Sequence, residues 1–443
     1  MAGTVSARRL ACVDVGSTFT KGLLIDLDDG QVCGRAAVPT TSRTDVLEGV
    51  EGALAALGAD PGVDPLVCSS AGGGLRLAVI GYEGTVTALA GHRVGLSAGA
   101  RVVHVATGAL SGPEVTALRR SRPDVLLLVG GTDGGNSEVL QHNAQRLAKA
   151  RLAAPVVLAG NAEAAAECAA LLRASDRTVI VADNVLPRIG ELSPIPAREA
   201  IRQVFLRHVI GGKGLSRGPR FASLVQMATP DAVLRGIEVL AAGRGQDVLA
   251  LDIGGATTDV YSALIPRGED AGVRREVSPP PRVLRTVEAD LGMRWSAPGI
   301  LEGALREGRP LSPEAGEYAA AVAADVEHVP SGASQWELEI ELANAAAVLA
   351  VRRHGRPVGA GAAPRALKEV GLLIGSGGVV RHASSANAQR VLQAVLGDHG
   401  GGWIVPAKAR ARVDTAYLLM AVGLLAGAHP HTAAALAARL AAQ

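Results

Sequence analysis

The sequence predicts an α/β protein with two similar strand-hairpin domains and a further α/β domain inserted in the chain. Three observations support this fold class. Short apolar runs alternate with helical segments over most of the 443 residues. A strand–Asp–Gly–strand pattern occurs twice. Between its two copies lies a block of closely spaced apolar runs and helices, which is typical of a parallel, doubly wound sheet.

Composition narrows the class of protein. Hydrophobic residues make up 48% of the chain and aromatic residues 2%, so the cores are expected to consist of Ala, Val, Leu and Ile. The formal charge is +2 with no long basic run, which argues against nucleic acid as a partner because phosphate-backbone binding needs a basic stripe. The four cysteines form no C-x-x-C pair and are expected to be reduced.

The chain is expected to be cytoplasmic and to make no membrane contact. The first residues, "MAGTVSARRLACVDV", contain no long apolar segment of the kind found in signal peptides. Near the end, the apolar stretch from Ala416 to Ala428 is too short to span a bilayer.

The first hairpin is predicted at "VDVGSTFTKG". An apolar strand carries Asp14, a turn follows through Gly16, Ser17 and Thr18, and the returning strand carries Lys21. Such a turn exposes backbone N–H groups and hydroxyls, which suit anionic oxygens. Glycine allows a phosphate to approach closely, and an Asp at a strand end can hold magnesium through water.

The inserted block is predicted from about Asp64 to Pro187. Its strand-like runs are "LVCSS", "RVVHVA", "DVLLLVGG", "PVVLAG" and "TVIVADN". Helical segments lie between them, and in "NSEVLQHNAQRLAKARL" the apolar residues share one helical face. This alternation predicts a separate doubly wound sheet.

A second hairpin repeats the pattern at "ALDIGGATTDVYS". Two such hairpins facing each other would grip the phosphates of one nucleotide from both sides. The loop "RGEDAGVRREVSPPPR" that follows is predicted to be an exposed hairpin or linker, and residues from about Gly299 to Arg353 are predicted to be mainly helical. The second hairpin contributes the candidate residues Asp252, Gly254, Gly255, Thr257, Thr258 and Asp259.

A third element, "LLIGSGGVVRH", is an apolar strand that runs into Gly375, Gly377 and Gly378 before a helix. Glycines at such a strand-to-helix turn let a flat ring or a ribose lie against the backbone. Its position after the two hairpins is what makes this short pattern informative.

With these residues the chain resembles the superfamily of actin, sugar kinases and seventy-kilodalton heat-shock chaperone ATPases. "DVGSTFTK" is similar to their first phosphate motif, "LDIGGATTD" to their second and "LLIGSGGVV" to their adenosine motif. "TPDAVLRGIEVLAAG" and "DTAYLLMAVGLLAG" are similar to their connecting helices. The resemblance implies duplicated ribonuclease H-like ATPase domains of the actin and heat-shock chaperone type, with the doubly wound block as an inserted domain.

More narrowly, "GSTFTK", "LLLVGGTDGGN", "DIGGATTDV" and "TVEADLGMR" resemble the glutamate mutase accessory family. Its members are called MutL or GlmL and are distinct from the mismatch-repair MutL. This resemblance covers nearly the whole chain. It implies an ATP-dependent accessory or reactivating chaperone for an adenosylcobalamin-dependent mutase, a function that is itself inferred in the family from related dehydratase reactivases.

The resemblance also implies roles for individual residues. Asp14 and Asp252 would face magnesium and its waters, and Lys21 would reach the β- and γ-phosphates. Asp259 would either act on the attacking water or cap its hairpin. The phosphates would be lined by Gly16, Ser17, Thr18, Gly254, Gly255, Thr257 and Thr258, and the adenosine by Gly375, Gly377 and Gly378.

The pattern departs from the chaperones at Thr229-Pro230, where their connecting helix begins with Glu-Pro. A threonine cannot act as a carboxylate base, so either hydrolysis is slow or Asp231 takes over.

For two further motifs the sequence leaves more than one role open. Val129 to Asn136 could bind an anion or a client or simply turn the chain, with Asn136 or Ser137 as the helix N-cap. Thr286 to Arg294 could be functional or a surface charge cluster.

The domain boundaries follow from this order. The predicted segments are 1–63, the first ATPase half; 64–200, the inserted domain; 201–245, a return to the first half; 246–298, the second ATPase half; 299–360, a mainly helical subdomain; and 361–443, the adenosine motif and C-terminal connecting helices.

Three functions compete. The first is a slow ATPase that acts as a chaperone, coupling ATP binding to release of damaged cofactor from a mutase. The second is a small-molecule kinase or a hydantoinase- or oxoprolinase-like subunit, and the third is an actin-like filament protein.

No D-x-H-x-x-G stretch, the pattern with which cobalamin enzymes ligate cobalt through histidine, occurs in the chain, so no bound cobalamin is expected. The client mutase and the oligomeric state stay open, with a homodimer as one alternative.

Overall fold

The computed structural model describes residues 8–42, 44–71, 75–84, 86–98, 100–150, 152–210, 215–265, 282–357, 365–399 and 403–442. The chain forms two compact units. Unit 1 comprises Met1–Gly236, Pro266–Leu284 and Met420–Leu436, and unit 2 comprises Ile237–Ile265, Arg285–Leu419 and Ala437–Gln443. The Pro-rich loop "RGEDAGVRREVSPPPR", predicted to be exposed, lies almost wholly outside the described residues.

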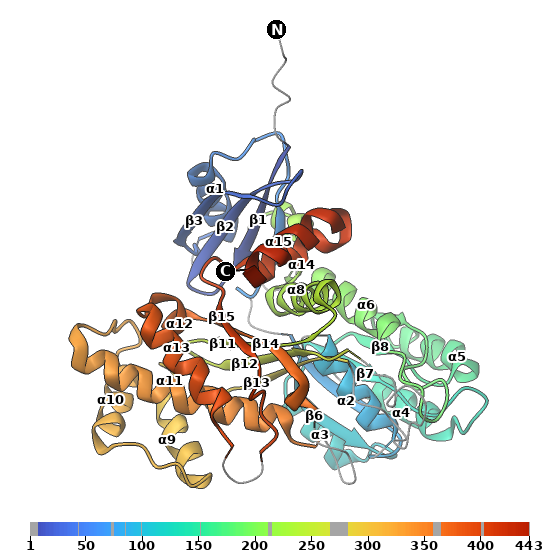
Figure 1. Ribbon diagram of the computed structural model, residues 1–443. Coiled ribbons are helices and arrows are strands. Elements are labelled where there is room, and N and C mark those ends of the chain that lie inside the picture. Colours follow the sequence, from blue (N-terminus) through green and yellow to red (C-terminus); the bar gives the residue numbers. More distant parts are fainter. Residues whose placement is uncertain are drawn as a thin grey trace. The chain divides into compact units, whose positions relative to one another are not determined.

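The first sheet belongs to unit 1 and has the strand order β10-β4-β1-β2-β3, of which Figure 1 labels β1, β2 and β3. The pairs β1–β2 and β2–β3 are antiparallel, whereas β4 is parallel to β1 and β10 is parallel to β4. Its strands are β1 (Arg9–Val15), β2 (Phe19–Asp26), β3 (Val32–Pro39), β4 (Leu66–Ser69) and β10 (Val225–Ala228).

The second sheet has the equivalent order β13-β12-β11-β14-β15. Here too a hairpin, β11–β12, is followed by a strand parallel to its first member, and β15 is parallel to β14. Both sheets thus have the ribonuclease H-like order 3-2-1-4-5, and the predicted duplication is confirmed. The strands are β11 (Asp247–Ile253), β12 (Thr258–Ala263), β13 (Val283–Glu288), β14 (Val370–Ser376) and β15 (Arg410–Val413).

A third, wholly parallel sheet with the order β6-β5-β7-β8-β9 confirms the inserted doubly wound domain. Its order, 2-1-3-4-5, is that of flavodoxin-like folds. One strand was predicted in the wrong sheet: Leu66–Ser69 pairs with β1, so the inserted sheet begins only at β5. The strands are β5 (Arg76–Gly81), β6 (Arg101–Thr107), β7 (Val125–Leu128), β8 (Val156–Leu158) and β9 (Val179–Val181).

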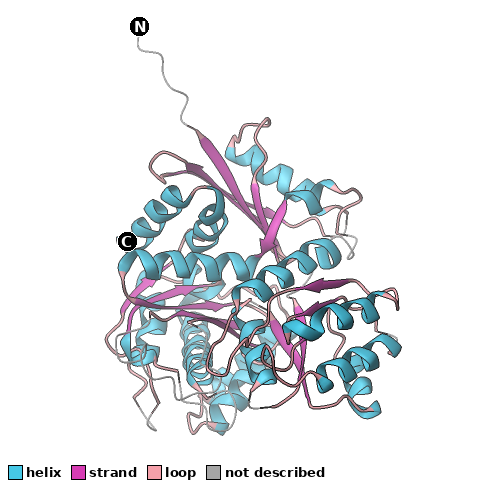
Figure 2. Cartoon of the chain, turned by 90° about the vertical axis from the view of Figure 1, so that its right-hand side faces the viewer, coloured by secondary structure: helices cyan, strands magenta, loops and turns pink. Residues whose placement is uncertain are grey.

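Helices cover both faces of this inserted sheet; Figure 2 shows the helices and strands of the chain in separate colours. Residues of α2 and α6 share one apolar cluster with Leu77 and Val79, whereas residues of α3, α4 and α5 share another with Ala78 and Ile80. The helices are α2 (Thr87–Ser97), α3 (Gly112–Arg120), α4 (Glu138–Lys149), α5 (Ala162–Arg173) and α6 (Ile195–Val204).

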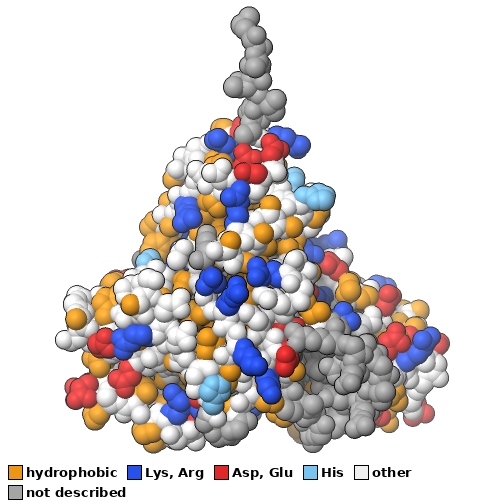
Figure 3. Space-filling view, in the orientation of Figure 1, with side chains coloured by type: hydrophobic (Ala, Val, Ile, Leu, Met, Phe, Trp, Pro, Cys, Tyr) orange, Lys and Arg blue, Asp and Glu red, His pale blue; other side chains and the backbone are white. Residues whose placement is uncertain are grey.

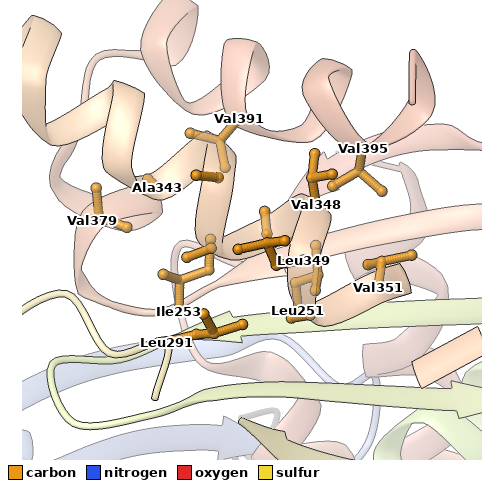
Figure 4. Packing of buried hydrophobic residues seen from close by; sticks show 14 of the residues in the cluster. Leu251, Ile253, Leu291, Ala343, Val348, Leu349, Val351, Val379, Val391 and Val395 are labelled. Atoms are coloured by element: carbon orange, nitrogen blue, oxygen red, sulfur yellow. The ribbon is translucent and has the colours of Figure 1, made fainter. Parts of the chain in front are cut away.

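Three helices confirm the helical prediction for residues 299–353. These are α9 (Ala297–Arg306), α10 (Pro313–Ala324) and α11 (Gly332–Gly355). Figure 4 shows Leu251 and Ile253 of β11 in one apolar cluster with Val348 and Leu349 of α11. Since side chains alternate along a strand, Asp252 lies on the opposite face of the sheet from this core.

The remaining elements include the two predicted connecting helices. The predicted connecting helices are α8 and α14, and each of them contains a boundary between the two units. The elements are α1 (Val46–Leu57), η1 (Phe205–Ile210), α7 (Arg220–Leu224), α8 (Thr229–Arg244), η2 (Leu367–Glu369), α12 (Gly378–His382), α13 (Ser385–Leu396), α14 (Leu418–Ala428) and α15 (Pro430–Ala442). The other predicted domain boundaries stay predictions.

The surface carries mixed charges (Figure 3), and the four cysteines form no disulfide, as the composition led us to expect. Charged side chains of both signs lie among apolar ones on the face shown in Figure 3. No helix within the described ranges combines the length and apolar character that a bilayer span requires. Cys12, Cys68 and Cys168 are buried, Cys33 is exposed, and all four are free thiols.

Close packing of α14 on α8 within unit 1 gives a test of the fold. A Cβ at Gly423 would overlap the carbonyl oxygen of Ala232, whereas a Cβ at Gly427 of the same helix would meet open space. We expect Gly423→Ala to lower the free energy of unfolding by about 1–3 kcal/mol through overpacking. Gly427→Ala should be neutral or stabilising by up to about 1 kcal/mol. Urea denaturation of both variants measures the difference, and equal effects would contradict this packing.

Candidate functional site

The two hairpin turns have the same backbone geometry. In the β1–β2 turn the Gly16 N–H donates to the Phe19 carbonyl at 3.1 Å, and in the β11–β12 turn the Gly254 N–H donates to Thr257 at 2.9 Å. A Cβ at Gly16 would lie 2.8 Å from the Phe19 carbonyl oxygen, and a Cβ at Gly254 would lie 3.0 Å from the Thr257 carbonyl oxygen. The sequence repeat therefore encodes one tight turn twice, and glycine at its first position avoids a close contact with the acceptor carbonyl in both copies.

The first turn is anchored from behind by one residue. The Thr40 hydroxyl donates to the Gly16 carbonyl at 2.9 Å, and the Thr40 N–H donates to the Thr18 carbonyl at 2.8 Å. In a trans peptide the N–H points opposite to the C=O, so the N–H of Ser17 points away from Thr40. Ser17 and Thr18 are exposed at the tip. Together they present an N–H group and hydroxyls on the open side of the turn.

The second turn is anchored by a segment that we call the 291–296 clamp (Leu291–Ser296). Four donors of this clamp bind three consecutive carbonyls of the turn. Because the carbonyls point into the clamp, the N–H groups of Gly255 and Ala256 point away from it. The bonds are Met293 N–H to Gly254 at 3.0 Å, Arg294 N–H and Trp295 N–H to Gly255 at 2.8 and 3.0 Å, and Ser296 Oγ to Ala256 at 3.0 Å.

Partly buried ion pairs hold the clamp to the helical subdomain. Arg294 binds the buried Glu339 at 2.9 Å, and the Tyr318 hydroxyl donates to the same carboxylate at 2.8 Å. Arg353 of α11 binds Glu288 at 2.9 Å, just before the clamp. Burial raises the pKa of Glu288, although the hydrogen bond and charge of Arg353 oppose this. The Thr286–Arg294 motif is thus the support of the second turn and more than a surface charge cluster.

Asp14 lies on the opposite face of β1 from the buried Val13 and Val15, directly across the hairpin from Lys21. The Thr229 hydroxyl donates to Asp14 Oδ1 at 2.5 Å, and the Cys68 thiol lies 3.7 Å from the same oxygen. Burial raises the pKa of the Asp14 carboxyl, whereas the Lys21 charge and these two hydrogen bonds lower it. The structure thus brings a buried carboxylate and a lysine together at the first turn.

The second hairpin places Asp259 where the first has Lys21. Asp252 pairs across the strands with Asp259, which is buried, and Arg285 of β13 donates to Asp259 Oδ2 at 3.1 Å. Asp259 is therefore held in a buried ion pair. Its partner Arg285 lies outside the second hairpin motif, so the sequence did not reveal this pair. Asp252 is only half-buried.

The adenosine motif lies beside the second turn within unit 2. Asp252 and Ser376 are in register on the parallel strands β11 and β14. Gly377 has φ 95°, and a Cβ there would overlap the backbone of Ile253. A glycine is therefore required at this point, both for its left-handed backbone and for the close approach of the two strand ends.

A pocket of about 250 Å³ lies next to this motif. Its His382 ends α12, the short helix that starts directly after Gly377, and its Trp336 comes from α11. Sequence reasoning missed this pocket because its residues come from two separate segments and form no motif. The lining residues are Ala333, Trp336, Glu337, His382, Ser384 and Asn387.

Two sequence expectations need correction. Thr258 was expected to line the phosphates, but it is fully buried and its hydroxyl donates to the Leu291 carbonyl at 2.6 Å. Asp231 was considered as a substitute base, but it is buried and binds Arg202 at 2.9 Å. The first residue supports the clamp, and the second is occupied by an ion pair.

The Val129–Asn136 loop of the inserted domain is fixed by two buried amides. Asn161 Nδ2 donates to the Thr132 and Gly135 carbonyls at 2.8 and 3.0 Å, and Asn184 Nδ2 donates to the Gly131 carbonyl at 3.0 Å. Asn136, and not Ser137, makes the capping bond to the first turn of α4. These contacts explain the turn without a ligand.

Two sheets of the same ribonuclease H-like strand order, each with an anchored glycine turn beside a strand that carries an aspartate, form the duplicated fold that the resemblance implied. The family model described as "MutL protein" matches residues 10–440. A protein named "Protein MutL" from Clostridium tetanomorphum is 34% identical over 440 residues, which covers 94% of this chain and 95% of that protein. The chain belongs to the MutL protein family.

Solved structures with similar folds are distant. The activator of 2-hydroxyisocaproyl-CoA dehydratase from Clostridium difficile, with bound ADPNP, has a TM-score of 0.32 at 9% identity, covering 96% of each chain. The ROK hexokinase from Thermus thermophilus has a TM-score of 0.29 at 12% identity, covering 98% of this chain and 99% of that one. Similarities at this level carry no argument about activity.

Gly292 tests the role of the clamp. A Cβ there would overlap the backbone of Ala256 and lie 2.7 Å from the Gly255 carbonyl. With the nucleotide function proposed in the next subsection, we expect Gly292→Ala to displace the clamp and weaken ADP binding about tenfold, which corresponds to the loss of one well-made hydrogen bond. Isothermal titration calorimetry measures this. The matched control is Gly52→Ala on α1, where a Cβ meets nothing within 4 Å. Unchanged affinity in Gly292→Ala would contradict the role of the clamp.

Proposed function

We propose that this chain binds ATP with magnesium and acts as an accessory factor that reactivates an adenosylcobalamin-dependent mutase. One observation carries the nucleotide part of this proposal: two turns of the same geometry have their carbonyls bonded from behind. Such turns offer N–H groups to anionic oxygens without any need to rearrange first. Family membership supports the accessory role.

In this proposal each hairpin offers its own groups to phosphate oxygens. Ser17 and Thr18 offer hydroxyls at one tip, and the N–H groups of Gly255 and Ala256 are directed outward at the other. Lys21, on the strand that returns from the first turn, supplies a positive charge for the β- and γ-phosphates. Thr258 is left out of this set because its hydroxyl is bonded inside the protein.

The acidic residues fit magnesium. Asp14 and Asp252 occupy equivalent positions in the two hairpins and offer carboxylate oxygens, which magnesium prefers, and magnesium usually takes one or two carboxylates together with phosphates and water. Among the described residues, no group of three or more His, Cys, Asp or Glu side chains could hold a metal. Water and the nucleotide would therefore complete its coordination. When bound, magnesium neutralises phosphate charge.

The pocket around Trp336 and His382 is proposed to take the adenine ring. Its His382 ends the short helix that starts after Gly377, and the pocket combines the aromatic rings of Trp336 and His382 with the polar side chains of Ser384 and Asn387. A flat ring can stack on such faces while polar groups fix its orientation.

Slow hydrolysis suits a conformational role better than metabolic turnover. Thr229 provides no carboxylate at the helix start, and Asp231 is engaged with Arg202. A nucleotide that is hydrolysed slowly can hold one conformation long enough to act on a partner. In the proposed role, this change releases damaged cofactor from the mutase so that intact coenzyme can replace it. A cytoplasmic location is part of the same proposal.

Lys21 tests the nucleotide part. We expect Lys21→Ala to weaken ATP binding by about 10–100-fold, because a hydrogen bond to a charged group contributes about 1.5–3 kcal/mol. Titration calorimetry with ATP measures the loss. Lys149→Ala, on an exposed position of α4 in the inserted domain, is the matched control. Equal affinities of the two variants would contradict the role of Lys21.

The client is tested by affinity capture. The immobilised chain is exposed to native lysate with ATP or ADP, and the captured proteins are identified by mass spectrometry. We expect subunits of a cobalamin-dependent mutase, in an amount that depends on the nucleotide and falls in Lys21→Ala. If the wild-type chain binds ATP and captures no mutase in either state, the client assignment fails and small-molecule phosphorylation becomes the next test.

A further inference from the structure

Three elements of unit 1 meet at the Asp14 carboxylate: β1, which carries Asp14, β4, and the start of α8, which carries Thr229. Thr229 is the first residue of α8 and follows β10 directly. β10 lies beside β4, and β4 lies beside β1, so this order brings Thr229 next to the end of β1. Its hydroxyl donates to Asp14 Oδ1 at 2.5 Å, the hydrogen bond already described for the first turn.

The second donor to this oxygen comes from a different strand. Cys68 of β4, fully buried, lies with its thiol 3.7 Å from Asp14 Oδ1. In parallel register, Cys68 is the direct neighbour of Asp14 on β1. Both donors bind the same oxygen, so they fix the rotation of the carboxylate and leave Oδ2 to other contacts.

The Thr229 hydroxyl and the Cys68 thiol are both neutral, so they can orient the Asp14 carboxylate but cannot form an ion pair with it. A lysine or arginine at position 229 would pair with Asp14 and cancel its charge, and a second carboxylate there would repel it. The Lys21 charge already acts on Asp14 from across the hairpin, and a neutral hydroxyl orients the carboxylate without adding a second charge. Hydrogen-bonding partners of this kind orient metal-binding groups in many proteins.

We propose that Thr229 is a positioning residue that holds Asp14 for the hydrated magnesium of a bound nucleotide. This inference rests on the proposed nucleotide function and deepens it. It gives the threonine at the start of α8 a role of its own: Thr229 orients the acidic group and takes no part as a base. The weaker, longer contact of Cys68 supports the same oxygen.

Three variants separate this role from a merely structural one. Thr229→Val keeps the shape and loses the donor, Thr229→Ser keeps the hydroxyl, and Cys68→Ala removes the weaker contact. ADP binding is measured by calorimetry in EDTA and across a magnesium titration. For Thr229→Val we expect the magnesium concentration at half-effect to rise about 10–100-fold, as for other partners of metal-binding groups. ADP affinity in EDTA should be unchanged.

The other two variants complete the expected pattern. Thr229→Ser should restore the wild-type magnesium dependence, and Cys68→Ala should shift it less than Thr229→Val. An unchanged magnesium dependence in Thr229→Val would overturn the inference, and so would an equal loss of ADP affinity with and without magnesium. If Thr229→Val does not fold, Thr229→Ala is compared with Thr229→Ser in the same way. Failure of the wild-type chain to bind ADP would instead refute the proposed nucleotide function.

Discussion

The bonding of the turn carbonyls is the constraint on which the candidate site depends. A glycine turn alone can rotate its peptide units either way, so its N–H groups have no fixed direction. Thr40 fixes this direction in the first hairpin, and the 291–296 clamp fixes it in the second. The alternation of β1 and β11 adds the acidic groups, because burying Val13 and Val15, or Leu251 and Ile253, leaves Asp14 and Asp252 on the other face.

The two halves share a turn but differ around it. Across from its aspartate the first hairpin has Lys21, and the second has Asp259 neutralised by Arg285. One turn is anchored by a single threonine, and the other by a segment tied through Arg294 and Arg353 to a helical subdomain. The second turn is thus connected to α11 through the clamp and its ion pairs.

Sequence reasoning identified what is local and missed what depends on pairing between distant segments. The glycine turns and strand alternation that place Asp14 and Asp252 follow from neighbouring residues, and they were predicted. The sheet that β4 joins, the burial of Thr258 and the ion pair of Asp259 with Arg285 depend on contacts with other elements. The pocket at Trp336 and His382 joins two segments in the same way. No short pattern in the chain encodes such contacts.

Each anchored turn is proposed to bind phosphate oxygens of a nucleotide, and amide hydrogen exchange tests this most directly. Peptides that contain the Ser17 amide and the Gly255 and Ala256 amides are followed by mass spectrometry with and without magnesium and ADP. We predict that exchange slows in both turns when nucleotide is added, whereas the Val129–Asn136 loop stays unchanged. Saturable nucleotide binding that leaves either turn unprotected would contradict the claim.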